Sequence, residues 1–224
     1  MATIAGIQEA RLTDVRAREE RRYAAGRPQS QAASQAAAGA DWLGGVPLHW
    51  MTDWPMPFPM VAAKAKGARL TDIDGFVVDD FCLGDTGSMF GHSPAPVARA
   101  IAAQARRGLT YMLPSADAAE VGRLLTRTFG DFRWQVATTA TDANRFALRV
   151  ARAVTGRPKV LVCNGCYHGT VDDTMVGLAK GRTVNRPGLL GQFADLSLGA
   201  VCCEFNDLAG VAAALAKGDV AAVL

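Results

Sequence analysis

The strongest constraint on the fold is an unbroken apolar Val-Leu-Val run at residues 160–162. A strand with one wet face alternates polar and apolar residues, whereas a continuous apolar run is typical of a strand buried on both faces of a parallel sheet. Residues 159–162 are therefore predicted to form such a buried strand.

Strand and helix patterns alternate around this run from about residue 93 onward, which predicts right-handed crossovers and a doubly wound α/β layer. The predicted elements are helices capped by Ser93 and Ser115, a strand at 134–138, a helix at 143–155 ending at Gly156, the strand at 159–162, a strand at 200–205, a helix at 207–217 and a strand at 220–224. Residues 177–199, with five glycines and Pro187, are expected to be a long surface loop. Because the chain stops at the end of an apolar strand, we expect it to be the first part of a longer polypeptide or one piece of a split protein.

The preceding residues have a different character. Residues 1–45 combine a charged helical stretch with a Gln- and Ala-rich segment and are interpreted as an N-terminal arm. Residues 46–92 contain a predicted β-hairpin turning at Asp74-Gly75, since glycine tolerates positive φ, and are assigned to a small β-element. Residues 93–224 are assigned to the first part of a large α/β domain.

Composition excludes several classes of protein. The 224 residues carry 24 Lys and Arg against 21 Asp and Glu, and this balance is too even to indicate nucleic-acid binding. No apolar run approaches the ~20 residues of a membrane span, and no secretory signal is visible at the N-terminus. The five cysteines are an odd number and are interpreted as reduced thiols of a cytoplasmic protein. Cys163 and Cys166 lack a second pair or a histidine cluster, so no metal site is predicted.

Two segments carry candidate chemistry. The first is the predicted strand end at Thr138-Thr139 followed by a helix start near Ala143, because the free amides and positive dipole of a helix N-terminus attract anions. Thr141 is equally well interpreted as a simple helix N-cap. The sequence contains neither a P-loop nor a dinucleotide-binding glycine motif.

The second segment is Gly-Cys-Tyr-His-Gly at 165–169, directly after the buried strand. Tyr167 can stack on a planar ligand, and His168 can hydrogen-bond or titrate near neutral pH. Packing of the pair within a loop is the plain alternative. Cys166 beside His168 also raises the weaker hypothesis of a thiol hydrolase.

Together these motifs resemble class-III pyridoxal-phosphate aminotransferases, which include glutamate-1-semialdehyde aminomutases and β-amino-acid aminotransferases. The likeness covers residues 44–224, and it is carried by the segments 136–152, 155–159 and 165–169 and by upstream motifs at 67–75 and 91–94. It implies a fold-type-I transferase, a homodimer, and pyridoxal 5'-phosphate (PLP) as cofactor.

The resemblance also implies individual roles. Ala140 and Thr141 match the Gly-Thr pair that holds the cofactor phosphate, and Thr139 matches the serine before it. Tyr167 matches the aromatic residue that stacks on the pyridine ring, with His168 beside it at the pocket wall. Asn144 and Asp142 match polar positions near the phosphate.

Three departures from the family pattern bear on function. Ala140 replaces a glycine. Asp85 stands where relatives carry an aromatic residue beside the substrate, so we expect it to favour a cationic or hydroxylated substrate group. The Schiff-base lysine is absent, because none of Lys64, Lys66, Lys159, Lys180 and Lys217 lies in a matching motif. No catalytic residue is therefore assigned, and this chain alone is expected to be inactive.

The favoured interpretation is transfer of an amino group between an amine or amino acid and a keto acid by the complete enzyme. The alternatives are an aminomutase or racemase with the same cofactor, or a non-catalytic subunit that supplies half a site.

Overall fold

The structure is a computed structural model that describes residues 9–192 and 194–224. These residues divide after Pro114 into two compact units, and each unit is described by itself.

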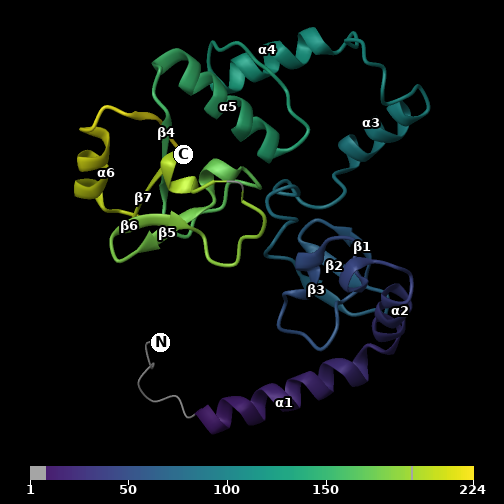
Figure 1. Ribbon diagram of the computed structural model, residues 1–224. Helices are drawn as coiled ribbons and strands as arrows, with labels where there is room; N and C mark the ends of the chain where they lie inside the picture. Colours follow the sequence, from purple (N-terminus) through teal and green to yellow (C-terminus); the bar gives the residue numbers. More distant parts are fainter. Residues whose placement is uncertain (1–8, 193) are drawn as a thin grey trace. The chain divides into compact units, whose positions relative to one another are not determined.

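The first unit contains a three-stranded antiparallel sheet of order β1-β2-β3. The predicted hairpin is confirmed, with Arg69 opposite Asp79 and Gly75 at φ +91° in its turn. Strand β1, which the sequence analysis missed, pairs with β2 on its other side. The elements are α1 (Glu9–Gly26), α2 (Pro28–Ala38), the 3-10 turns η1 (Leu43–Gly45) and η2 (His49–Thr52), β1 (Ala62–Lys66), β2 (Arg69–Asp72), β3 (Val77–Asp79) and α3 (Ala95–Ala105) (Figure 1).

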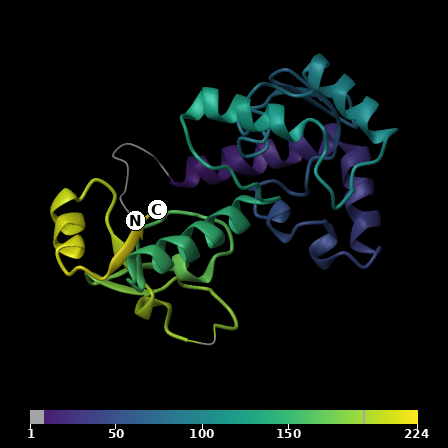
Figure 2. The same cartoon turned by 90° about the horizontal axis from the view of Figure 1, so that it is seen from above.

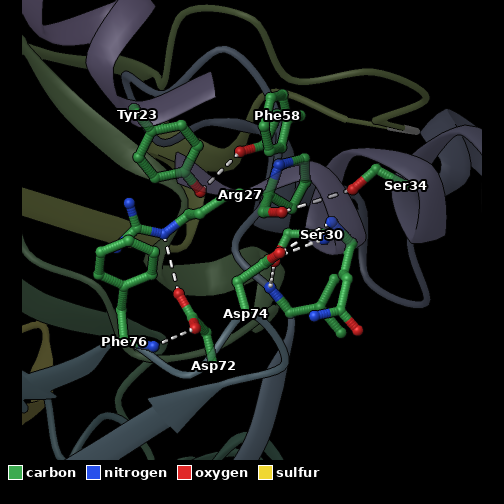
Figure 3. Close-up of polar contacts among 11 residues, drawn as sticks. Tyr23, Arg27, Ser30, Ser34, Phe58, Asp72, Asp74 and Phe76 are labelled. Atoms are coloured by element: carbon green, nitrogen blue, oxygen red, sulfur yellow. Dashed lines mark hydrogen bonds and ion pairs between the residues drawn. The ribbon is translucent and has the colours of Figure 1, made fainter. Parts of the chain in front are cut away.

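The N-terminal helices are fastened to this sheet by the turn between β2 and β3. Asp74 accepts hydrogen bonds from the backbone amides of Gln29 and Ser30 and from the Ser30 hydroxyl, so it caps helix α2 from 44 residues away (Figure 3). Arg27, which precedes the helix, donates to Asp72 at 2.9 Å. The predicted arm is therefore packed against the β-element through buried polar contacts.

The second unit is built around a parallel sheet of order β7-β4-β8. It contains α4 (Ala118–Phe129), α5 (Ala140–Thr155), β4 (Lys159–Cys163), η3 (Asp172–Thr174), β5 (Val176–Ala179), β6 (Arg182–Asn185), η4 (Leu196–Leu198), β7 (Ala200–Cys203), α6 (Leu208–Leu215) and β8 (Val220–Val223).

Strand β4 is the centre of the core, and the burial predicted for it is confirmed. Val160 and Val162 pack on one face with Leu148 of helix α5, while Leu161 packs on the other face with Ala214 of helix α6. Alternate residues of a strand point to opposite faces, so both faces of the sheet are covered. Helices α5 and α6 thus flank the sheet, as Figures 1 and 2 show within this unit, and the predicted doubly wound α/β layer is confirmed.

Several local predictions were wrong. Residues 134–138 form no strand, because none of the described strands pairs with them. Ser93 does not cap α3: its φ is +50°, its hydroxyl donates to the Ala65 carbonyl, and Pro94 takes the N-cap position. Helix α4 begins after Asp117 instead of Ser115. The expected loop at 177–199 contains most of the antiparallel hairpin β5–β6.

Candidate functional site

The start of helix α5 has free hydrogen-bond donors. The helix begins at Ala140, three residues before the predicted start, and its N-cap is Thr139, whose hydroxyl accepts from the Asp142 amide at 3.0 Å. The proposed capping role of Thr141 is therefore wrong. Within the described part of the chain, the amides of Ala140 and Thr141 have no hydrogen-bond partner. These donors and the helix dipole make this end of α5 attractive to an anion.

The loop that follows β4 lies directly against this helix end. The Thr141 hydroxyl accepts from the Thr170 amide at 3.3 Å, and the Asn144 side-chain amide donates to the His168 carbonyl at 3.0 Å. Gly169, at φ +79°, permits the approach: a Cβ there would lie 2.1 Å from Oγ1 of Thr141. The structure therefore brings together two motifs that lie more than 20 residues apart in the sequence.

Tyr167 and His168, two of the three residues between the glycines of this loop, differ in environment. Tyr167 is 67% exposed, so its ring is free to meet a ligand. His168 is half-buried, and no polar group of the described residues pairs with its buried Nε2. Burial lowers the pKa of His168, and the nearby positive charge of Arg186 lowers it further, so both favour the neutral form of the imidazole.

The thiol chemistry considered for Cys166 is not favoured by its surroundings. Burial raises the pKa of the Cys166 thiol, which lowers the thiolate population on which nucleophilic attack depends. Burial also raises the pKa of the neighbouring Cys202 to about 11. All five cysteines are free thiols, and no metal-binding group of three or more His, Cys, Asp or Glu side chains occurs among residues 9–192 and 194–224.

Two departures from the family pattern can be located. Ala140 is the first residue of α5 with an ordinary helical backbone, so this position does not require a glycine. Asp85 belongs to the first unit, in an exposed turn where Leu83, Asp85 and Thr86 all have positive φ.

The sequence analysis missed Arg186, which follows strand β6. Its guanidinium donates to the Cys166 carbonyl within the loop. A hollow of about 490 Å³ between this loop and the β5–β6 hairpin is lined by Arg186, Asn164 and Gly165, but its lining does not include Thr141 or Tyr167. The start of helix α5 (residues 139–144) and the loop at 165–170 that contacts it are together called the shelf.

Comparison with known proteins defines the class of this chain. Residues 51–211 match the family described as aminotransferase class-III. The chain belongs to this family.

Individual relatives are more specific than the family match. The chain is 32% identical over 170 residues to a glutamate-1-semialdehyde 2,1-aminomutase from Archaeoglobus fulgidus, covering 75% of this chain and 41% of that protein. It is similar to the crystal structure of a glutamate-1-semialdehyde aminomutase from Pseudomonas aeruginosa PAO1, with 49% identity, a TM-score of 0.91, and coverage of 97% of this chain and 48% of the other. A variant of the same enzyme has been solved in complex with pyridoxamine phosphate (PMP).

More distant structures share the fold as well. An omega-transaminase from Sphaerobacter thermophilus is 26% identical with a TM-score of 0.77, covering 87% of this chain and 46% of the other. These neighbours are fold-type-I enzymes, so the predicted fold class is confirmed. The chain spans about half the length of the relatives it matches.

Every described helix is too short or too polar to cross a lipid bilayer.

Proposed function

We propose that this chain supplies the phosphate-binding and ring-stacking half of a PLP site. The observation that supports the proposal is the contact between the start of helix α5, which has free amides, and the loop that bears the exposed Tyr167. Support also comes from related structures solved with PLP or PMP bound.

The residues on this shelf fit the two ends of the cofactor. The amides of Ala140 and Thr141 and the Thr141 hydroxyl would hold the phosphate, with Thr139 fixing the turn into the helix. The face of Tyr167 would stack on the pyridine ring, and the unpartnered Nε2 of His168 gives the pocket wall a polar group. Asn144 would act indirectly, by holding the His168 carbonyl.

When bound, the cofactor supplies an aldehyde that takes up amines and a ring that accepts electron density. This chain would orient the ring and neutralise the phosphate charge. Of its five lysines, Lys159 pairs with Asp219 at 2.8 Å, Lys180 lies in the hairpin turn and Lys217 follows α6, while Lys64 and Lys66 belong to β1. We therefore propose that activity requires a lysine outside these 224 residues. We also propose that the complete enzyme is a homodimer, as the family resemblance implies.

The reaction we propose is amino-group transfer within one molecule, as in an aminomutase. The specific support is the 49% identity to the Pseudomonas aeruginosa aminomutase, nearly twice that to the transaminase. Transfer from an amine or amino acid to a keto acid is the second candidate, supported by the transaminase neighbours.

Removing the Thr141 hydroxyl tests the phosphate half of the site. We expect Thr141→Val to weaken PMP binding by about tenfold, because a hydrogen bond to a charged group is lost. Thr155→Val is the matched control, since its hydroxyl bonds the Ala151 carbonyl at the other end of α5. Fluorescence titration with PMP measures the affinity of both variants. Absence of saturable PMP binding by the unaltered protein would contradict the proposed function.

The substrates that the holoenzyme requires for turnover distinguish the two reactions. We expect glutamate-1-semialdehyde alone to be converted, with the amino group moving to the neighbouring carbon and no keto acid consumed. Turnover that requires both an amine donor and a keto acid would overturn the aminomutase and favour the transaminase. A protein that binds PMP but converts neither would favour the non-catalytic half-site subunit.

Asp85 is proposed as a substrate-recognition residue. Among the described residues its carboxylate accepts no hydrogen bond, so it is available to a cationic or hydroxylated substrate group. We expect Asp85→Asn to raise KM about tenfold for a cationic substrate and to leave KM unchanged for a neutral analogue. The backbone should be undisturbed, because asparagine tolerates positive φ as aspartate does. Unchanged steady-state kinetics with the best substrate would reject this role.

A further inference from the structure

The loop that carries Tyr167 is held from both sides by side chains outside it. On the C-terminal side, Asn144 donates to the His168 carbonyl and Thr141 accepts from the Thr170 amide. On the N-terminal side, Arg186 is the side chain that donates to the Cys166 carbonyl. The Tyr167 backbone therefore lies between two pinned carbonyls, while its ring remains exposed.

Arg186 is itself fixed by the β5–β6 hairpin. Its backbone amide donates to the Met175 carbonyl at 2.9 Å, extending the hairpin ladder beyond Asn185. The hairpin is tied to the end of β4, because the Leu178 amide donates to the Asn164 side chain at 3.1 Å. The half-buried Arg186 thus extends from a hydrogen-bonded hairpin to the Tyr167 loop.

We propose that Arg186 is a positioning residue for the cofactor ring: by holding the Cys166 carbonyl it fixes the loop that presents Tyr167. This inference rests on the proposed function and extends it to a residue on a separate hairpin. Holding the backbone on both sides lowers the conformational entropy that a stacking ring loses when it binds a ligand.

Its charge has a second effect on the same shelf. Arg186 lies close enough to His168 to disfavour protonation of the imidazole, and burial acts in the same direction. Within the described residues, no carboxylate hydrogen-bonds or forms an ion pair with the guanidinium of Arg186. Its interactions are therefore directed at the loop and its histidine.

The first experiment measures PMP affinity, a readout that does not need turnover. Arg186→Met keeps the length of the side chain but removes its donors and charge, and we expect PMP to bind about tenfold to a hundredfold more weakly. Arg186→Lys restores one charged donor and should recover part of the affinity. Arg182→Met is the matched control on the same hairpin, because Arg182 is exposed, and its affinity should be unchanged.

The second experiment tests whether Arg186 acts through Tyr167. We expect Tyr167→Ala alone to weaken PMP binding. In the Tyr167→Ala background, Arg186→Met should weaken binding little further, because the effects of two substitutions on the same interaction are not additive. Affinity for inorganic phosphate, which has no ring, should be the same with and without Arg186. The near-ultraviolet circular dichroism of bound PMP should change in Arg186→Met and be partly restored in Arg186→Lys.

The outcomes separate this inference from the proposed function. If the unaltered protein binds no PMP, the proposed function fails. If it binds PMP but Arg186→Met binds equally well, or if the two substitutions weaken binding additively, the positioning role is wrong. Equal loss of phosphate affinity in Arg186→Met would also overturn it, because that result indicates a general structural effect.

Discussion

Replacing Asp72 with asparagine should lower the free energy of unfolding of the first unit by about 3–5 kcal/mol, the usual cost of breaking a buried ion pair by removing one charge. The Asp72 side chain is fully buried, and its partner Arg27 is 13% exposed. The guanidinium lies 4.5 Å from the ring centre of Tyr23 and 4.3 Å from that of Phe76 (Figure 3). Asparagine has nearly the same shape, but it leaves the positive charge between these rings without the counter-charge that hydrogen-bonds it.

Urea unfolding followed by tryptophan fluorescence measures this loss, because Trp42, Trp50 and Trp54 of the four tryptophans belong to the first unit. The matched control is Asp79→Asn. Asp79 pairs with Arg69 at 3.4 Å, but both side chains are about 70% exposed, so we expect a loss below about 1 kcal/mol.

The double variant Arg27→Met with Asp72→Asn makes the prediction sharper. Because it leaves no unpaired buried charge, it should be more stable than either single variant. A single Asp72→Asn variant as stable as Asp79→Asn would show that the ion pair does not hold helix α2 on the sheet.

The sequence predicted best what is local and periodic. The apolar stripe and terminal Gly156 of α5, the buried β4 and the hairpin turn at Asp74-Gly75 all follow from residues within one element. The pairing of Arg27 with Asp72 did not, since its partners are 45 residues apart and no pattern links them. Residues 134–138 have an apolar pattern typical of a strand, but a strand also requires a paired neighbour, which no pattern within the segment can reveal.

In the candidate site, too, local features could be predicted and a contact between distant segments could not. Thr141 and Tyr167 could be selected from helix-start chemistry and from the family resemblance, and the structure places their segments in contact. The N-cap residue considered for helix α5 was Thr141, but the structure has Thr139, two residues earlier. The sequence alone did not separate them, because the two threonines are chemically equivalent as caps. Arg186 carried no sequence signal, because its role depends on a hairpin inside a segment that resembles a loop.

Gly169→Ala should have the largest effect on the shelf, weakening PMP binding by about a hundredfold or more. The residue has φ +79°, and a Cβ there would lie 2.1 Å from Oγ1 and 3.0 Å from Cα of Thr141. The Thr141 side chain could turn away, but its Cα cannot move without shifting the start of α5. The left-handed backbone and the overlap together cost a few kcal/mol, so we expect the loop to leave the helix end.

Gly165→Ala is the matched control for this effect. Gly165 lies at the other end of the same loop with φ +77°, yet a Cβ there would have no atom within 4 Å. Its substitution tests the backbone penalty alone, about 1 kcal/mol, and PMP affinity should fall no more than about fivefold. Urea unfolding of both variants shows whether the second unit remains folded. If folded Gly169→Ala and Gly165→Ala proteins bind PMP equally well, close contact between this loop and the start of helix α5 is not what assembles the site.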